Sequence, residues 1–140
     1  MKIVVMDAQG GGVGRLLVEG LKKELPGQPV IAAGTNAMAT AAMLRAGADQ
    51  GATGENAIVV CARQADIILA PIGMVLCDAM LGEVTAAMAA AVGSSPARRI
   101  LIPISRCQTS IAGLPPLTLS EAVDAAIRSA AEEVRTREKA

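Results

Sequence analysis

The sequence has no phenylalanine, tyrosine, tryptophan or histidine. Aromatic side chains are the usual stacking platforms for bases and the rigid anchors of protein interfaces, so their absence argues against a nucleic-acid-binding surface. Histidine is the most frequent general base and a common metal ligand, and its absence removes the simplest acid–base chemistry. Thirteen basic and thirteen acidic residues cancel, which leaves no overall field for nucleic acid or an anionic membrane. We expect no nucleic-acid partner and no metal site.

Cysteine and long apolar runs are also scarce. The three cysteines are Cys61, Cys77 and Cys107. They form no C-x-x-C pair and leave an odd count for disulfides, so we interpret them as buried thiols in a reducing cytoplasm. The best membrane candidate, residues 68–81, is broken by proline, glycine and aspartate and is too short to span a bilayer. The N-terminus lacks the layout of a secretion signal. We expect a cytoplasmic protein without a membrane partner.

Apolar residues, in contrast, make up 52% of the 140 residues, enough for the core of one ordinary domain. Apolar runs of strand length alternate with helical patterns. Strands are predicted at residues 3–6, 30–33, 66–70 and 100–104. Helices are predicted at residues 12–25, from 35 or 36 to 45, at 57–62, 74–92 and about 118–138, with a polar turn at 47–56. The last helix opens on Thr118 and Glu121, which have the spacing of a capping box.

This alternation predicts a single α/β domain over residues 1–140, a Rossmann-like three-layer sandwich. Its sheet is mostly parallel, with four to five strands and helices on both faces. Ligands of such sheets bind beyond the carboxyl ends of the strands, near the point where strand order reverses. The candidate loops are Asp7–Arg15, Gly34–Asn36, Pro71–Gly73 and Ser105–Cys107.

The first of these loops contains four glycines directly behind an apolar strand, in the stretch MDAQGGGVGRLL. Glycine permits positive φ and lets backbone N–H groups approach an anion, and the following helix adds its positive end. We predict a phosphate site, with a simple tight turn as the alternative. In the helix's first turn Arg15 opposes the dipole, which a bound anion would justify, although a solvated arginine is the alternative.

Neither common phosphate-loop motif fits this stretch fully. Gln9 replaces the first glycine of both G-x-G-x-x-G and G-x-x-x-x-G-K-[ST], and Leu16 replaces the hydroxyl residue of the second. A magnesium-dependent NTPase loop is therefore disfavoured. Gly34 and Thr35 lie where a dinucleotide fold places an acid for the ribose hydroxyls, and Asn36 offers a weaker substitute.

Two further stretches, GTNAMAT and GATGENA, place capping residues at predicted helix starts. Ordinary capping by Thr35 and Thr53 is the alternative to a role in binding. Glu55 and Asn56 offer an acceptor and an amide beside the anion. The candidate binding residues are Asp7, Gln9, Gly10, Gly11, Gly12, Val13, Gly14, Arg15, Gly34, Thr35, Asn36, Thr53, Gly54, Glu55, Asn56, Pro71, Ile72 and Gly73.

Residues for catalysis are few. Asp7 and Glu83 are the carboxylates nearest the predicted crevice, Asp7 as a common loop-orienting acceptor and Glu83 as a solvated or capping group within a helix. Cys107 lies beside Arg106, but nothing in the sequence gives the thiol a base. The catalytic residues stay unknown, and the chain is more readily a binding protein than an enzyme.

Four strings carry a resemblance to a protein family: MDAQGGGVGR, AAGTNAMATAAMLRAGADQGATGENAIVV, ADIILAPIGMVLCDAMLGEVT and RRILIPISRC. Over roughly residues 1–113 the chain resembles domain-of-unknown-function family 3842. The resemblance implies a small Rossmann-like protein in a bacterial cytoplasm and supplies no reaction. It carries over Asp7, Gln9, Gly10 to Gly12, Gly14, Gly34 to Asn36 and Thr53 to Asn56.

Three functions remain open. We prefer a small nucleotide- or phosphate-ligand-binding protein, acting as a sensor or an accessory subunit, whose partner is a small anionic ligand such as NAD(P) or another nucleotide. The first alternative is a reduced Rossmann-type enzyme, an NAD(P)-dependent oxidoreductase or transferase using Asp7, Glu55 or Cys107. The second is a non-catalytic assembly protein that forms a homodimer through the helix at 74–92, because exposed apolar helices tend to be covered by partners.

Overall fold

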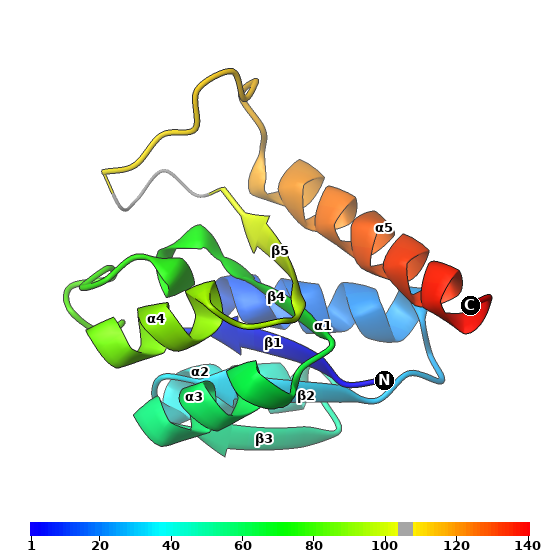
Figure 1. Cartoon of the computed structure of the whole chain (residues 1–140), viewed down its shortest axis with the longest axis horizontal. Coiled ribbons are helices and arrows are strands. Elements are labelled where there is room, and N and C mark those ends of the chain that lie inside the picture. The colour runs from blue at the N-terminus through cyan, green and yellow to red at the C-terminus, as the bar shows by residue number, and fades with distance from the viewer. Residues whose placement is uncertain (104–107) are drawn as a thin grey trace.

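The structure, a computed structural model, describes residues 1–103 and 108–140, which contain an all-parallel five-stranded sheet between two layers of helices (Figure 1). The strand order is β3-β2-β1-β4-β5. The strands are β1 (Ile3–Asp7), β2 (Val30–Gly34), β3 (Gln50–Thr53), β4 (Ile67–Pro71) and β5 (Arg98–Ile102). The helices are α1 (Gly12–Glu24), α2 (Ala37–Arg45), α3 (Glu55–Gln64), the 3₁₀ helix η1 (Ile72–Val75), α4 (Ala86–Gly93) and α5 (Leu119–Glu138). The predicted Rossmann-like α/β fold is confirmed.

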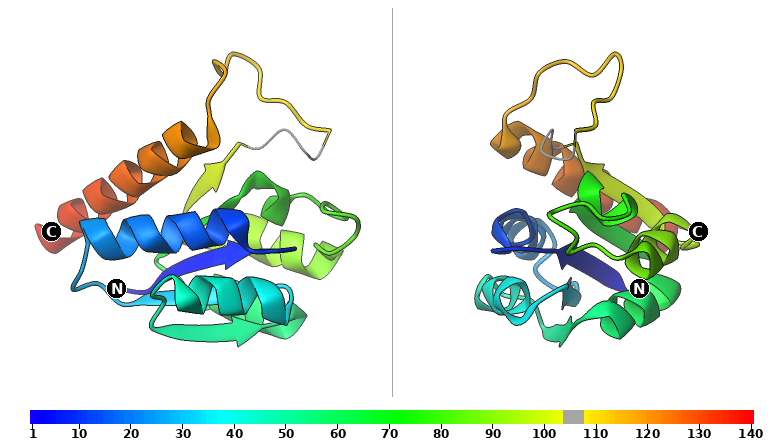
Figure 2. Two further views of the ribbon diagram at one scale, coloured as in Figure 1. Left: turned by 180° about the vertical axis from the view of Figure 1, so that it is seen from behind. Right: turned by 90° about the vertical axis from the view of Figure 1, so that its left-hand side faces the viewer.

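The two faces of the sheet carry separate apolar cores. Ile3 and Val5 of β1 pack with α1 and α5 on one face, while Val4 and Met6 pack with α3 and α4 on the other. The edge-on view in Figure 2 shows these helical layers on opposite sides of the strands. Because β1 and β4 are covered on both faces, all their residues are buried, which explains their unbroken apolar runs.

Most predicted elements are confirmed, with small shifts of their ends. The helix expected at 57–62 is α3, and it is longer at both ends. Helix α5 starts with the predicted capping box, in which Thr118 Oγ1 accepts from the Glu121 amide at 3.1 Å and Glu121 Oε1 accepts from the Thr118 amide at 3.2 Å. The strand expected at 100–104 begins earlier, at Arg98, and its last predicted residue lies outside the described part of the chain.

The prediction of a polar turn over residues 47–56 is wrong, because β3 occupies Gln50–Thr53. This strand pairs in parallel with β2 at the edge of the sheet, and three of its four residues are exposed. An exposed edge strand needs no alternating apolar side chains, so its sequence has no hydrophobic period to detect.

The prediction of one helix over residues 74–92 is also wrong. After η1 the chain makes a series of turns, in which Asp78, Met80 and Leu81 have φ values of 65°, 59° and 59°. Left-handed backbone of this kind cannot continue an α-helix. Helix α4 begins only after Thr85, whose Oγ1 accepts from the Met88 amide at 3.2 Å.

Among the described residues, no helix is long and apolar enough to cross a membrane.

The turn between β1 and α1 depends on a glycine at its fourth and last position, Gly11. Gly11 has φ 73° and ψ 18°, and its amide donates to Ala8 O at 3.0 Å. A Cβ at Gly11 would lie 2.9 Å from both the Cα and the carbonyl oxygen of Ala39. A Cβ at Gly10 would meet nothing within 4 Å. Only Gly11 combines left-handed backbone with close approach to α2.

We expect Gly11→Ala to lower the free energy of unfolding by about 2 kcal/mol, because left-handed backbone alone costs a non-glycine residue about 1–2 kcal/mol and the contact with Ala39 adds to it. Gly10→Ala is the matched control and is expected to change stability by less than about 0.5 kcal/mol. Equilibrium urea unfolding measures both values. Equal stability of the two variants would contradict the described turn.

Candidate functional site

Asp7, the last residue of β1, accepts hydrogen bonds from residues 8–14, which we call the glycine loop. Its side chain is 3% exposed, and its Oδ1 and Oδ2 accept from the amides of Ala8 and Gly14 at 2.8 and 2.7 Å. A Cβ at Gly14 would lie 2.9 Å from the Asp7 Cβ, so glycine allows α1 to approach the strand this closely. Asp7 is therefore the loop-orienting acceptor that its position at the strand end suggested.

The pKa of Asp7 is raised from its ordinary value. Burial disfavours the charged carboxylate, and this effect outweighs the opposing effect of the backbone N–H groups that it accepts from; the charge of Glu83 raises it further.

Only some amides of the loop remain open to a ligand. The Gln9 amide donates to Glu83 Oε1 at 2.8 Å, the Gly11 amide to Ala8 O, and the Gly14 amide to Asp7. The amides of Gly10 and Gly12 have no hydrogen-bond partner among the described residues. These two N–H groups are the donors that the loop offers.

Helix α1 begins at these open amides without a cap. It has no side-chain N-cap hydrogen bond and no acidic residue in its first turn. Helices α2, α4 and α5 are each capped by the side chain of Asn36, Thr85 or Thr118. The one described side chain that meets the positive end of the α1 dipole is the buried carboxylate of Asp7, which accepts from the Gly14 amide in the first turn.

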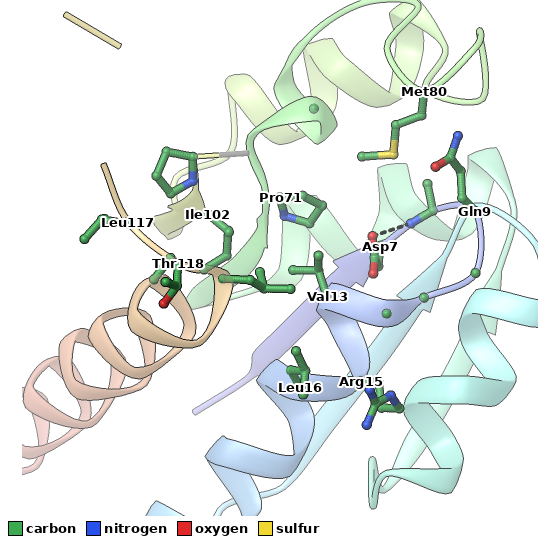
Figure 3. A pocket seen from close by; sticks show the side chains of 18 of the residues that line it. Asp7, Gln9, Val13, Arg15, Leu16, Pro71, Met80, Ile102, Leu117 and Thr118 are labelled. Carbon is green, nitrogen blue, oxygen red and sulfur yellow. Dashed lines mark hydrogen bonds between the residues drawn. The ribbon is translucent and has the colours of Figure 1, made fainter. Parts of the chain in front are cut away.

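A cavity of about 870 Å³ opens beside this helix start (Figure 3). It lies between the glycine loop, the end of β4, the end of β5 and the start of α5, so it is at the β1–β4 boundary where strand order reverses. Figure 3 shows Val13, Pro71 and Ile102 facing one another across it. Its lining residues are Asp7, Ala8, Gln9, Gly10, Gly11, Gly12, Val13, Arg15, Leu16, Pro71, Gly73, Met80, Leu81, Ile102, Pro103, Leu117, Thr118, Leu119 and Ala122.

Half of the predicted site residues line this cavity. They are Asp7, Gln9, Gly10, Gly11, Gly12, Val13, Arg15, Pro71 and Gly73. The other half, which do not line it, are Gly14, Gly34, Thr35, Asn36, Thr53, Gly54, Glu55, Asn56 and Ile72. Arg15 Nη1 pairs with Glu19 Oε1 at 3.1 Å, and both side chains are about half exposed, so Arg15 is the solvated, paired arginine of the alternative interpretation.

Glu83 connects the glycine loop to the residues that follow β2 by hydrogen bonds. Its Oε1 accepts from the Gln9 amide at 2.8 Å, from Thr35 Oγ1 at 2.5 Å and from Asn36 Nδ2. The expectation that Glu83 lies within a helix is wrong, because it is part of the turns that precede α4. The hydroxyl of Thr35 therefore donates to Glu83, and the side-chain amide of Asn36 donates both to Glu83 and to Gln9 O, the latter at 2.9 Å.

The pKa of Glu83 is lowered. Partial burial acts to raise it, but the hydrogen bonds from Thr35, the Gln9 amide and Asn36 together outweigh burial and favour the ionised form.

The residues from Thr53 to Asn56 do not line the cavity, and two of their side chains make contacts within the fold. Thr53 Oγ1 donates to Thr40 Oγ1 at 2.8 Å, and the N-cap of α3 is Gly54, with no side-chain cap. The expectation that Thr53 caps a helix is therefore wrong. Glu55 accepts from Thr85 Oγ1 at 2.8 Å, which links α3 to the start of α4.

The opposite wall of the cavity was missed from the sequence. It comes from Ile102, Pro103 and the start of α5, with Met80 and Leu81 from the turns before α4 and Leu16 from α1. The capping box identified where α5 starts, but no local pattern shows that this start lies against the glycine loop. The predicted loop at 105–107, with Arg106 and Cys107, lies outside the described residues.

The cysteines that the structure describes are not both buried. Cys61 is partly buried, whereas Cys77 is exposed, so the interpretation of Cys77 as a buried thiol is wrong.

Comparison with known proteins confirms the family resemblance. A family model described as a domain of unknown function (DUF3842) matches residues 2–135. The chain belongs to this family. The match includes most of α5, which the sequence resemblance had placed outside its main part. No curated protein and no solved structure matches the chain. The family description names no reaction, so a function must be argued from the cavity.

We expect Asp7 and Glu83 to titrate on opposite sides of their ordinary ranges. The contribution of Asp7 to the free energy of unfolding is present at low pH and is lost as the pH rises through its raised pKa. The contribution of Glu83 is present at higher pH and is lost as the pH falls through its lowered pKa. Amide chemical shifts measured by NMR against pH report both groups, Gly14 for Asp7 and Gln9 for Glu83. Glu83→Gln should abolish the Gln9 transition and keep that of Gly14. A Gln9 midpoint at or above the ordinary glutamate value contradicts the described contacts.

Proposed function

We propose that this protein binds a small phosphate-bearing ligand, with a nucleotide as the favoured class, in the cavity between β1 and β4. One observation carries the proposal: α1 begins at this cavity with no hydrogen bond from an N-cap side chain and with two open amides, those of Gly10 and Gly12. Unpaired N–H groups at a helix start, together with the helix dipole, form an anion site.

The loop is already fixed in the shape that such a ligand needs. Its other amides are held by Ala8 O, Asp7 and Glu83, so binding a phosphate at Gly10 and Gly12 requires no ordering of the backbone. A preorganised site retains more of its interaction energy as affinity, because less entropy is lost on binding.

The wall that faces the loop suits the rest of a nucleotide. Ile102, Leu117 and Leu119 offer aliphatic contacts to a flat, weakly polar group such as a base. The volume of about 870 Å³ lies within the usual range of small-molecule sites. Arg15 is the one cationic residue among the described residues that line the cavity, and its half-exposed side chain is free to exchange Glu19 for a phosphate oxygen.

Among the described residues that line the cavity, none favours the enzyme alternative. Both oxygens of Asp7 accept backbone N–H groups, and Thr118 Oγ1 accepts from the Glu121 amide. The described lining residues therefore present no nucleophile beside a general base. A binding role as a sensor or an accessory subunit requires neither. The cytoplasmic location and the homodimer remain predictions from the sequence.

The proposal is tested by placing a charge at Gly12. A Cβ there meets nothing within 4 Å, and an acidic side chain at a helix start stabilises the helix by about 0.3–1 kcal/mol. Gly12→Asp should therefore fold normally but repel a phosphate. We expect ATP, GTP, NAD(P), cyclic nucleotides, flavins or coenzyme A at millimolar concentration to raise the melting temperature of the wild type. We expect Gly12→Asp to weaken the best of these ligands at least about tenfold.

Two control variants separate charge from size and place. Gly12→Asn has the size of the aspartate without its charge and should weaken binding less. Gly27→Asp adds the same charge beyond the far end of α1, at another site where a Cβ meets nothing within 4 Å, and should leave binding unchanged. If no ligand of the panel raises the melting temperature, or if Asp and Asn at position 12 act alike, the ligand is not an anion held at these amides.

A further inference from the structure

A smaller pocket, of about 340 Å³, adjoins the cavity that the glycine loop lines. We call it the second pocket. Pro103 and Leu117 line both the cavity and the second pocket, so the two meet at the aliphatic wall that faces the glycine loop. Most of the second pocket is formed by residues 109–117, which belong to the segment that arches away from the sheet before α5 begins (Figure 1). The cavity therefore continues past its apolar wall.

The second pocket is lined mainly by aliphatic side chains. Seven of its nine lining residues are aliphatic or proline, among them Ile72, Ile111 and Leu114, and the other two are Thr109 and Ser110. None of these nine residues is charged. A charged group that entered the second pocket would lose water without gaining a partner of opposite charge. An apolar group, in contrast, would be removed from water against aliphatic neighbours.

Exposed apolar side chains gather around these two hollows. Among the described residues, eight large hydrophobic side chains are exposed, and five of them line the cavity or the second pocket. These five are Leu81, Ile111, Leu114, Leu117 and Leu119. Single exposed apolar residues are normal on a protein surface, whereas a contiguous group of them marks a binding surface.

We infer that the ligand reaches past the aliphatic wall and places an apolar group in the second pocket, so that its class is a nucleotide whose base carries an apolar substituent. This inference rests on the proposed phosphate site at Gly10 and Gly12. The order of the parts fits one molecule: the phosphate at the open amides, the base against Leu117, and the substituent beyond Leu117. A volume of about 340 Å³ is at the lower end for a whole ligand and suits one part of a larger ligand.

The wall of the second pocket is restrained before a ligand binds. Pro115 and Pro116 each have a fixed φ, which limits the conformations of the segment that lines the pocket. The segment then ends at Thr118, whose Oγ1 accepts from the Glu121 amide at 3.1 Å in the capping box of α5. An apolar group can therefore bind at a small cost in chain entropy.

The test compares ATP with N6-benzyl-ATP by isothermal titration calorimetry, because the two differ only in an apolar group on the base. Burial of a group of this size increases affinity by about tenfold or more, so the wild type should bind N6-benzyl-ATP at least about tenfold more tightly than ATP. Leu114→Asp places a charge in the second pocket and changes no residue that lines the cavity. In this variant the ratio should fall below about threefold, while the affinity for ATP stays within about threefold of the wild type.

The matched control is Leu44→Asp on α2. Leu44 and Leu114 are both 42% exposed, but Leu44 lines neither the cavity nor the second pocket. Leu44→Asp should therefore keep the wild-type ratio of the two affinities. Should Leu114→Asp fail to fold, Ile111→Asp replaces it, because Ile111 lines the same pocket and is 46% exposed.

The outcomes separate this inference from the proposed function. If the wild type binds ATP as tightly as N6-benzyl-ATP or more tightly, the second pocket does not hold a substituent of the base, whereas the phosphate site stands. If the aspartate variant of the second pocket keeps the wild-type ratio, the benzyl group binds elsewhere and the inference is wrong. If neither nucleotide binds at millimolar concentration, the proposed function is wrong and the inference with it.

Discussion

The buried carboxylate of Asp7 is the contact on which the site depends. It ends the central strand β1, is 3% exposed, and accepts the amides of Ala8 and Gly14. Burial disfavours the charge of this carboxylate, and the hydrogen bonds from the two amides offset part of that cost. Its hydrogen bond from the Gly14 amide fixes the first turn of α1 against β1. Since α1 also contacts α2 and α5, one whole layer of the fold is positioned through this turn.

The sequence predicts those parts of the fold that are stabilised by contacts between neighbouring residues or that are fully buried. The strands β1, β2 and β4 have unbroken apolar runs because both of their faces are covered, and α5 has its capping box. The edge strand β3 has no such signal, since polar residues suffice at an exposed edge. The turns before α4 are a different case. Their apolar composition favours a helix, but Glu83 and Thr85 form contacts with β2 and α3 that a continuous helix would not allow.

The site is predictable only in part for the same reason. Four glycines behind a strand indicate a loop with accessible amides, but not which amides remain open. The Gln9 amide is taken by a side chain 74 residues away, and Thr35 Oγ1 by the same side chain 48 residues away. The apolar wall at Leu117 and Leu119 likewise faces the glycine loop only through tertiary packing. Partners so distant in the chain leave no local pattern.

Asp7 and Glu83 place two carboxylates beside the proposed anion site, where their negative charge would be expected to repel an anion. Their hydrogen bonds explain why they are there. Asp7 accepts from the Gly14 amide and Glu83 from the Gln9 amide, so neither amide is open to a ligand. What remains open is the pair at Gly10 and Gly12, so the carboxylates limit where a phosphate can bind rather than prevent its binding. A glycine loop without these acceptors would offer more N–H groups and would select a ligand less sharply, because specificity requires that competing positions be closed.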